Sequence, residues 1–156
     1  MKIRQARSDD AVSIVDELWI AFAREMAKAD QYNALASDFR TNAIEHRKEK
    51  LSQENYCAHL AVEDSVLVGF VAGEVQPSPP VFERGATLRI NEVYVRPDWR
   101  RQGIASELLE ALEAWADKRE YDTVSLSVNA DNHAAKALYE NFGFETKRLQ
   151  MVKPRD

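Results

Sequence analysis

The sequence predicts an α+β fold in which helices flank a mixed central sheet. In the middle of the chain, strand-like runs are joined by short turns, as in antiparallel hairpins. Farther along, strand-like and helical runs alternate, which is typical of parallel crossovers. The 156 residues are 45% hydrophobic and 30% charged, as in an ordinary soluble globular protein with a real core. Because the sequence shows no internal repeat and no linker, we expect a single domain over residues 1–156.

The first half of the chain reads as a strand, two helices and a hairpin. Residues 2–6 alternate weakly between apolar and polar types and predict a short strand. Ser8 is expected to cap the first helix, with acidic residues in its first turn. The apolar positions of this helix recur at helical spacing: Ala11, Val15, Leu18, Phe22 and Met26. The elements expected next are a helix over residues 38–51 and a hairpin of strands 56–64 and 66–76.

The second half begins with a loop, because residues 77–85 contain three prolines and a glycine. Gly143 stands where a helix commonly ends on a glycine. The elements expected after the loop are a strand over residues 86–95, a helix over 104–116, a strand over 121–128, a helix over 132–141 and a strand over 144–153.

Composition and charge exclude several classes of protein. The net charge of −5 argues against nucleic acid, whose binding proteins usually carry a basic face. No apolar run has the ~20 residues that span a bilayer, and the first residues do not resemble a signal peptide, so we expect no membrane partner and a cytoplasmic protein. His46, His59 and His133 lack metal-ligand spacing, and we expect no metal. Cys57, the only cysteine, is expected in the core.

The turn before the helix at residues 104–116 gathers cations at a helix start. Arg100 and Arg101 supply positive charge, and Gly103 would let a ligand approach the backbone closely. The first N–H groups of a helix have no partner within it and lie at the positive end of its dipole. These features together favour a bound phosphate, although a solvated turn has the same composition.

Two motifs carry a family resemblance. The segment "RRQGIA" resembles the [QR]-x-x-G-x-[GA] signature of the GNAT superfamily of acetyl-CoA-dependent N-acetyltransferases, with Arg100, Gly103 and Ala105 at its defining positions. Farther along, "NADNHAAKALYENFGF" resembles the second motif of the same family. The two motifs occur in the expected order on a strand–helix–strand–helix background. The strong similarity covers residues 90–144.

The resemblance implies that acetyl-CoA is the acetyl donor and that its pyrophosphate occupies the turn. Backbone groups of the preceding strand would lie along the pantetheine arm, where a bend or bulge would expose an oxyanion donor. Asn132 would contact the cofactor or cap its own helix, and Lys136 would reach a phosphate or remain solvated. The expected cofactor-binding residues are Val93, Tyr94, Val95, Arg100, Arg101, Gln102, Gly103, Ile104, Ala105, Ser106, Asn132 and Lys136.

Glu92 is the candidate residue for handling the amine. An amine with a pKa near ~10.4 is neutral in only about one molecule in a thousand at pH 7, so a carboxylate could help to deprotonate it through water. Strand alternation places Glu92 and Tyr94 on one face, opposite Asn91, Val93 and Val95. Binding of the cationic amine, or a purely structural role, remains open for Glu92.

Tyr139 is the candidate general acid. A phenol with a pKa near ~10 stays protonated above the range of a thiol near ~8.5, and can donate to the departing sulfur. Without the resemblance, this tyrosine would read as a core aromatic residue with a solvated hydroxyl. With it, the assignment as the acid is favoured.

The expected activity is direct transfer of an acetyl group to a primary amine. The acidic chain and Glu92 favour a small cationic amine, with a protein N-terminus or lysine, or an acyl-CoA-binding module without turnover, as alternatives. The first two helices, residues 30–32 and the loop at residues 77–83 are expected to shape the acceptor pocket. Homodimers are common among the relatives that the resemblance implies, but the sequence carries no interface signature.

Overall fold

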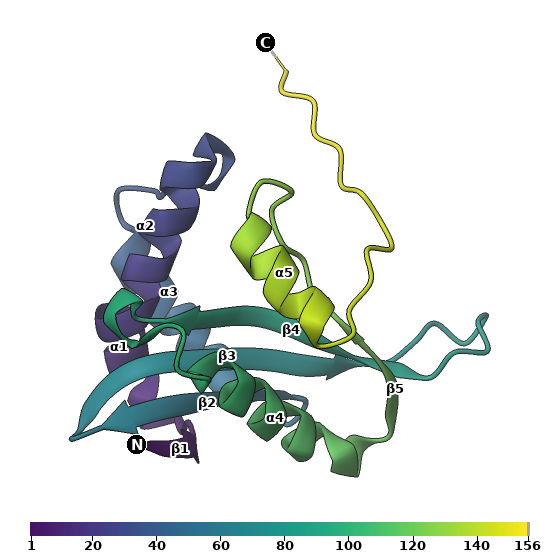
Figure 1. The fold of residues 1–156 in the computed structure, drawn as a ribbon, viewed down its shortest axis with the longest axis horizontal. Helices are drawn as coiled ribbons and strands as arrows, with labels where there is room; N and C mark the ends of the chain where they lie inside the picture. The colour runs from purple at the N-terminus through teal and green to yellow at the C-terminus, as the bar shows by residue number, and fades with distance from the viewer. Residues whose placement is uncertain (156) are drawn as a thin grey trace. The chain divides into compact units, whose positions relative to one another are not determined.

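The structure, a computed structural model, describes residues 1–155 and forms two compact units, Met1–Leu126 and Ser127–Asp156. A five-stranded sheet in the order β1-β2-β3-β4-β5 forms the first unit (Figure 1). The strands are β1 (Lys2–Gln5), β2 (Tyr56–Glu63), β3 (Val66–Gln76), β4 (Ala86–Val95) and β5 (Tyr121–Ser125). The first four are antiparallel neighbours, whereas β5 runs parallel to β4. The predicted mixed sheet is thereby confirmed.

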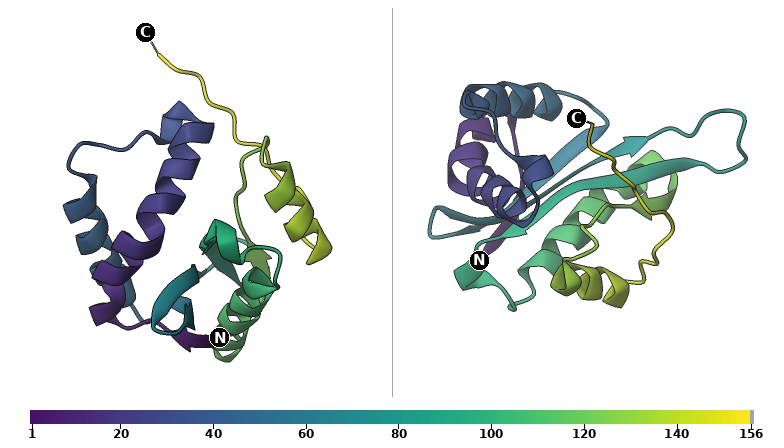
Figure 2. Two further views of the ribbon diagram at one scale, coloured as in Figure 1. Left: turned by 60° about the vertical axis from the view of Figure 1, so that its left-hand side comes forward. Right: turned by 90° about the horizontal axis from the view of Figure 1, so that it is seen from above.

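Helices cover both faces of this sheet (Figure 2). One face carries the first long helical segment and α3 (Phe39–Leu51), and the opposite face carries α4 (Ile104–Ala116). The first segment consists of a 3-10 turn (Ser8–Asp10), α1 (Ala11–Ile14), a π turn (Val15–Trp19) and α2 (Ile20–Ala29). Shorter 3-10 turns occur at Gln31–Asn33, Pro97–Trp99 and Asp117–Arg119. The helices predicted over residues 38–51 and 104–116 are therefore confirmed.

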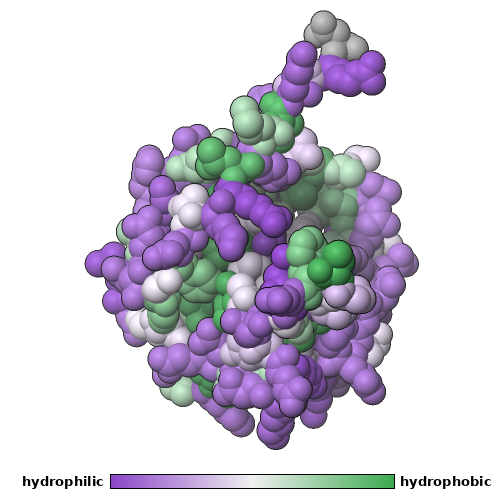
Figure 3. Space-filling model, turned by 90° about the vertical axis from the view of Figure 1, so that its right-hand side faces the viewer, coloured by the Kyte–Doolittle hydropathy of each residue, from purple (hydrophilic) through white to green (hydrophobic). Residues whose placement is uncertain are grey.

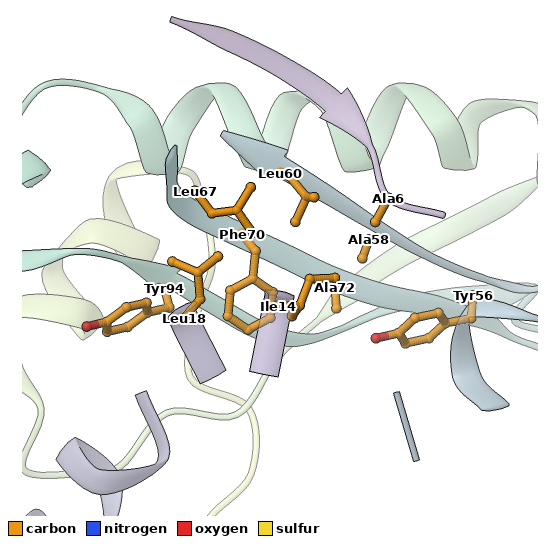
Figure 4. Close-up of a cluster of buried hydrophobic side chains, with 10 residues drawn as sticks. All are labelled: Ala6, Ile14, Leu18, Tyr56, Ala58, Leu60, Leu67, Phe70, Ala72 and Tyr94. Carbon is orange, nitrogen blue, oxygen red and sulfur yellow. The ribbon is translucent and has the colours of Figure 1, made fainter. Parts of the chain in front are cut away.

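The main core lies between the sheet and the first helical segment (Figure 4). Ile14 and Leu18 are four residues apart, so they share a helix face, and both are fully buried against Phe70 of β3. Three of the five apolar residues predicted to pack in the first helix, Ala11, Val15 and Leu18, are fully buried, and Ile14 is fully buried beside them. Burial of each large side chain contributes roughly 1.5–3 kcal/mol of hydrophobic free energy.

A second apolar layer joins α4 to the opposite face of the sheet. The buried residues of this helix are Ile104, Leu108, Leu109, Leu112 and Ala116. Gly73 of β3 permits the close approach, since a Cβ there would lie 2.9 Å from Leu112 Cδ2 and 2.8 Å from the carbonyl oxygen of Arg89. The helix start is therefore held at a fixed position relative to β3 and β4.

The start of the first helical segment differs from the prediction that Ser8 is its cap. Ser8 is already the first residue of the 3-10 turn, and its side chain makes no capping hydrogen bond. Instead, the carboxylate of Asp10 accepts the backbone N–H of Arg7 at 2.8 Å. The guanidinium of Arg4 also donates two hydrogen bonds of 2.9 Å to Asp10, which lowers the pKa of that carboxyl. Asp10 thus fixes the start of the segment from its third position, which is a different role from the cap that was predicted for Ser8.

The second unit contains α5 (His133–Asn141). Asn132 caps this helix, because its side chain accepts the N–H of Ala135 at 3.1 Å. Gly143 has a φ of +92°, and the helix end is closed by hydrogen bonds from Gly143 N to Glu140 O and from Phe144 N to Tyr139 O, each 3.0 Å. The predicted C-terminal glycine is confirmed.

The prediction of a strand over residues 144–153 is wrong. These residues form no strand in the structure, and Leu149 and Met151 are 82% and 91% exposed. A β-strand is stable only where a neighbouring strand satisfies its N–H and C=O groups, and alternation of side chains does not supply that neighbour. Similarly, β5 ends at Ser125, three residues before the predicted end. No helix among residues 1–155 is both long and apolar enough to cross a membrane.

The surface matches the composition of the chain. In Figure 3 hydrophilic residues predominate on the visible face, with smaller hydrophobic patches between them. This is the distribution expected for a chain with 30% charged residues and a net charge of −5.

Candidate active site

The turn from β4 to α4 forms the first half of the candidate site. Arg101 has a φ of +65° and Gly103 a φ of +81°, so both lie in the left-handed region. A Cβ built on Gly103 would meet nothing within 4 Å, which means that the glycine is needed for its backbone angle and that the space beside it is open. No side chain caps the start of α4. The first N–H groups of the helix are therefore available to an anion.

The arginines around this turn divide into two kinds. Arg100 donates from Nε to the carbonyl oxygen of Val95 at 2.8 Å and from its terminal nitrogen to the Glu25 carboxylate at 3.1 and 3.2 Å. Its guanidinium also lies 5.5 Å from the ring centre of Tyr94. Arg96 similarly donates to the carbonyl oxygen of Glu17 at 3.1 Å. These two side chains hold the turn against β4 and the first helical segment.

Arg101 is the arginine that remains free for a ligand. It is exposed, and it has no hydrogen-bond or ion-pair partner among residues 1–155. The sequence did not distinguish Arg100 from Arg101. The structure assigns the first to bracing of the turn, whereas the charge of the second stands unpaired beside the helix start.

One edge of β4 is also open beyond the turn. β5 pairs with β4 only over Ala86–Arg89, so among residues 1–155 that edge has no strand partner from residue 90 to residue 95. On its other edge, Val93, Tyr94 and Val95 pair with β3 in regular register. The backbone groups on the open edge can therefore bind an extended ligand in the manner of an added strand.

A β-bulge lies just before this open stretch. Ala72 pairs with Glu92 and Gly73 with Ile90, so Asn91 is an extra residue on β4. The bulge precedes Val93 instead of lying within residues 93–95. It also cancels the alternation that placed Asn91 opposite Glu92, because both residues line one cavity. The prediction that Asn91 and Glu92 lie on opposite faces is therefore wrong, since one inserted residue moves the side chains that follow it to the other face of the sheet.

Glu92 is held by a buried arginine from α3. Arg47 is 4% exposed and donates to both carboxylate oxygens of Glu92, at 2.7 and 2.9 Å. The same guanidinium donates to the hydroxyl of Tyr56 at 2.7 Å and lies 5.3 Å from the ring centre of Phe70. Burial alone would lower the pKa of Arg47, but the adjacent Glu92 carboxylate outweighs it and raises the pKa. The guanidinium of Arg47 is therefore charged at neutral pH.

A cavity of about 280 Å³ opens beside this ion pair. Its wall consists of Ala43, His46, Arg47 and Lys50 from α3, Asn91 and Glu92 from β4, and Trp19 and Tyr56. Both the first helical segment and α3 contribute residues to it. Neither residues 30–32 nor the loop at residues 77–83 lines this cavity.

The sequence interpretation missed Arg47, although a signal for it exists. Ile44, Arg47 and Leu51 are spaced by three and four residues, so they share the inward face of α3. Arg47 is also the one buried residue of that helix. An arginine on an inward face needs a charged or polar partner. Nothing in the sequence identifies that partner as Glu92, which is 45 residues away.

The remaining candidate residues lie on α5 of the second unit. Tyr139 is half-buried, and its ring packs edge-on against Phe144 with 5.9 Å between centres. Burial raises the pKa of its phenol, so the hydroxyl keeps its proton at neutral pH. The side chain of Asn132 is engaged in the helix cap, whereas Lys136 is exposed.

Cys57 lies in the core, as predicted. It is 2% exposed, and burial raises its pKa to about 12. Its sulfur lies 3.5 Å from Nδ1 of His59, whose own pKa is lowered by burial. A neutral imidazole does not stabilise a thiolate, so this pair lacks the character of a nucleophile. Among residues 1–155, no group of three His, Cys, Asp or Glu side chains could hold a metal ion.

The mixed sheet, the open edge of β4 and the uncapped start of α4 together form a site suited to an extended ligand that carries a phosphate. The sequence model of the acetyltransferase (GNAT) family matches residues 15–144. The chain therefore belongs to the GNAT family, and the resemblance found in its two motifs is confirmed.

Similar sequences include several acetyltransferases. An aminoglycoside N(6')-acetyltransferase type 1 of Acinetobacter genomosp. 13 is 35% identical over 95 residues, which cover 59% of this chain and 58% of that protein. A [ribosomal protein bS18]-alanine N-acetyltransferase of Escherichia coli strain K12 is 48% identical over 58 residues, 37% of this chain and 39% of that protein. The chain spans about half the length of the curated relatives it matches.

Solved structures share the fold over nearly the whole chain. The protein BH1408 of Bacillus halodurans, in a tetramutant form, has a TM-score of 0.86 and 18% identity over 99% of this chain and 100% of that one. The aminoglycoside N-acetyltransferase AAC(6')-Iy in complex with CoA has a TM-score of 0.73 and 16% identity over 99% and 95%. At such low identity these likenesses establish the fold alone.

Proposed function

We propose that the protein is an N-acetyltransferase that moves the acetyl group of acetyl-CoA directly to the primary amine of a small cationic molecule. The observation that carries this proposal is the turn at Gly103. In a chain of the GNAT family, this left-handed glycine precedes a helix whose first N–H groups no side chain caps. That arrangement is suited to a diphosphate.

Most contacts to acetyl-CoA would come from the protein backbone. The amides of residues 101–106 would hold the pyrophosphate, with the free charge of Arg101 beside it. The open edge of β4 at residues 93–95 would hold the pantetheine arm as an added strand. Lys136, which is exposed, would add charge near a phosphate. The acetyl thioester is the reactive group that bound acetyl-CoA supplies.

Aminolysis then requires one proton to leave the amine and one to reach the sulfur. A carbon–nitrogen bond forms while the carbon–sulfur bond breaks. Glu92 would orient the amine, or a water that takes its proton, through the lone pairs that Arg47 leaves free. Since Arg47 already neutralises its charge, Glu92 is better suited to fixing this geometry than to attracting a cation. Tyr139 would donate its phenolic proton to the departing thiolate.

Charge and relatives support a small amine as acceptor. The net charge of −5 favours a cationic partner, and the first relative described above is named for aminoglycosides. A protein N-terminus is the second candidate, because the 58-residue match with the bS18-alanine acetyltransferase has the higher identity of 48%.

Release of the CoA thiol, measured over a panel of amines, tests the proposal. The panel contains diamines, an aminoglycoside, amino acids and a peptide with a free N-terminus, and mass spectrometry identifies the acetylated product. We expect at least one small amine to be acetylated. If the protein binds acetyl-CoA and no amine is acetylated, it is an acyl-CoA-binding module. If only the peptide is acetylated, the small-amine assignment is wrong.

A further inference from the structure

We infer that the cavity beside Glu92 receives an amine that also carries a carboxylate, such as an amino acid, and that it disfavours polycations. This inference rests on the proposed acetyl transfer to a small amine, but the wall of the cavity favours a zwitterion over the polycations that the net charge and the aminoglycoside relative suggest. It comes from the charges of the cavity wall and from the partners that each charge already has.

Among residues 1–155, the wall of the cavity offers no free carboxylate. Glu92 is its one acidic residue, and both of its oxygens accept hydrogen bonds from Arg47. The carboxylate of Glu74, which pairs with the cavity residue Lys50 at 3.4 Å, is engaged too, because it also accepts a hydrogen bond from Gln76 at 3.3 Å. A diamine or aminoglycoside would bring several ammonium groups, and only one of them could lie beside Glu92. The others would lose water without gaining a counter-charge.

Lys50 supplies what a carboxylate needs. Its side chain is 27% exposed, and the contact with Glu74 at 3.4 Å uses only one of the three N–H donors of the ammonium, so the other two can bind a ligand carboxylate while that contact is kept. His46 is four residues earlier on α3 and lines the same cavity, which places an imidazole beside this ammonium. Asn91 adds an amide donor on the opposite wall. These three groups together can bind an anionic oxygen.

The spacing of the two partners fits a small molecule. Arg47, which holds Glu92, and Lys50 are three residues apart on α3, so their Cβ atoms are about 5–6 Å apart. An amine beside Glu92 and a carboxylate beside Lys50 are therefore separated by only a few bonds. Trp19 supplies an apolar wall for the rest of the molecule. An amino acid combines these three features.

Matched acceptors separate this inference from a general affinity for amines. Phenylalanine and lysine are each compared with their own carboxamides, which keep the skeleton and lose the negative charge; cadaverine and an aminoglycoside represent polycations. Binding is measured by calorimetry with protein saturated with CoA, so that no turnover is required. Thiol release with acetyl-CoA gives kcat/KM, which is normalised to the concentration of neutral amine. The Lys50→Met variant removes the ammonium, and Lys48→Met, an exposed position on the same helix, is the control.

We expect each amino acid to bind at least about tenfold more tightly than its amide, as for a charge-assisted hydrogen bond. Lys50→Met should reduce this ratio to less than about threefold, and Lys48→Met should leave it unchanged. Equal or tighter binding of the amides or polycations, an undiminished ratio in Lys50→Met, or no binding of any amino acid would overturn the inference. Selective binding of amino acids without thiol release would sink the proposed function and leave the inference standing. Turnover of amines without selectivity for amino acids would support the proposed function and overturn the inference.

Discussion

The turn before α4 and the cavity beside Glu92 lie a few residues apart along the chain, yet they present different kinds of chemical group to a ligand. At the turn, the groups that face a ligand are backbone N–H groups, and the conformation depends on Gly103. In the cavity, they are side chains from four elements, and the ion pair of Arg47 and Glu92 joins two of these elements, α3 and β4. A backbone site tolerates many substitutions and suits a ligand shared by a whole family. A side-chain site changes with single substitutions and suits the acceptor that varies.

The largest expected effect falls outside both regions. Tyr139→Phe removes only a hydroxyl, so acetyl-CoA and acceptor should bind as before while kcat falls by roughly 10²–10⁴-fold, the usual contribution of a positioned acid. Single-turnover kinetics at pH 6 to 9, with calorimetry of both ligands, measure the two quantities. A wild-type rate with chemistry rate-limiting would show that another group protonates the thiolate. A loss of acetyl-CoA binding would show that Tyr139 contributes to binding of the cofactor.

The cavity should be the more fragile of the two regions. Arg47→Met leaves the half-buried carboxylate of Glu92 without its partner, which should lower the free energy of unfolding by about 3 kcal/mol, as for a broken buried pair. Chemical denaturation measures this loss. Arg40→Met breaks an exposed pair with Asp16 and should have almost no effect. Adding Glu92→Leu to Arg47→Met should restore part of the stability. Equal losses of stability in Arg47→Met and Arg40→Met would contradict the assigned role of the buried pair.

At the turn, Gly103→Glu should affect the cofactor alone. The new carboxylate would enter the open space beside the helix start and repel the pyrophosphate, so the affinity for acetyl-CoA should fall at least about tenfold, or ~1.4 kcal/mol. Gly103→Ala introduces backbone strain without charge or clash and should change affinity by less than about threefold. Undiminished affinity in the glutamate variant would remove the basis of the phosphate assignment. Acceptor binding to either variant should remain as in the wild type.

The smallest effect is expected at Asp10, which belongs to neither region. Because Arg4 lowers the folded-state pKa of Asp10 below its ordinary value of 3.8, the pair stabilises the protein above pH ~4 and loses this contribution as the pH falls through the folded-state pKa. Arg4→Met should therefore reduce the free energy of unfolding at pH 7 by about 1 kcal/mol or less, and less still at pH 3. Denaturation at both pH values measures the difference. Arg7→Met, which leaves Arg4 and Asp10 paired, is the control, and an equal loss at both pH values would exclude the linkage.

The fold and the turn were predictable because their signals are local. β3 and β4 have the predicted bounds, since each is a strand-like run that ends at turn residues. The helix start at Gly103 follows from a short motif. The cavity was not predictable, because its wall joins Trp19, Arg47 and Glu92 across the sequence. The face of Asn91 was misassigned for a related reason: a bulge depends on the pairing of two strands, and one strand alone does not reveal it.

The burial of Cys57 has a practical consequence for experiments on this protein. Acetyl transfer liberates a thiol, and reagents that react with thiols are the direct way to follow it. Since the chain has one cysteine, 2% exposed and with a pKa raised to about 12, the folded protein should add no background to such an assay. The same residue can also be used to measure local opening of the folded protein. Its slow labelling under native conditions reports how often β2 opens, and so gives the local free energy of opening without an introduced probe.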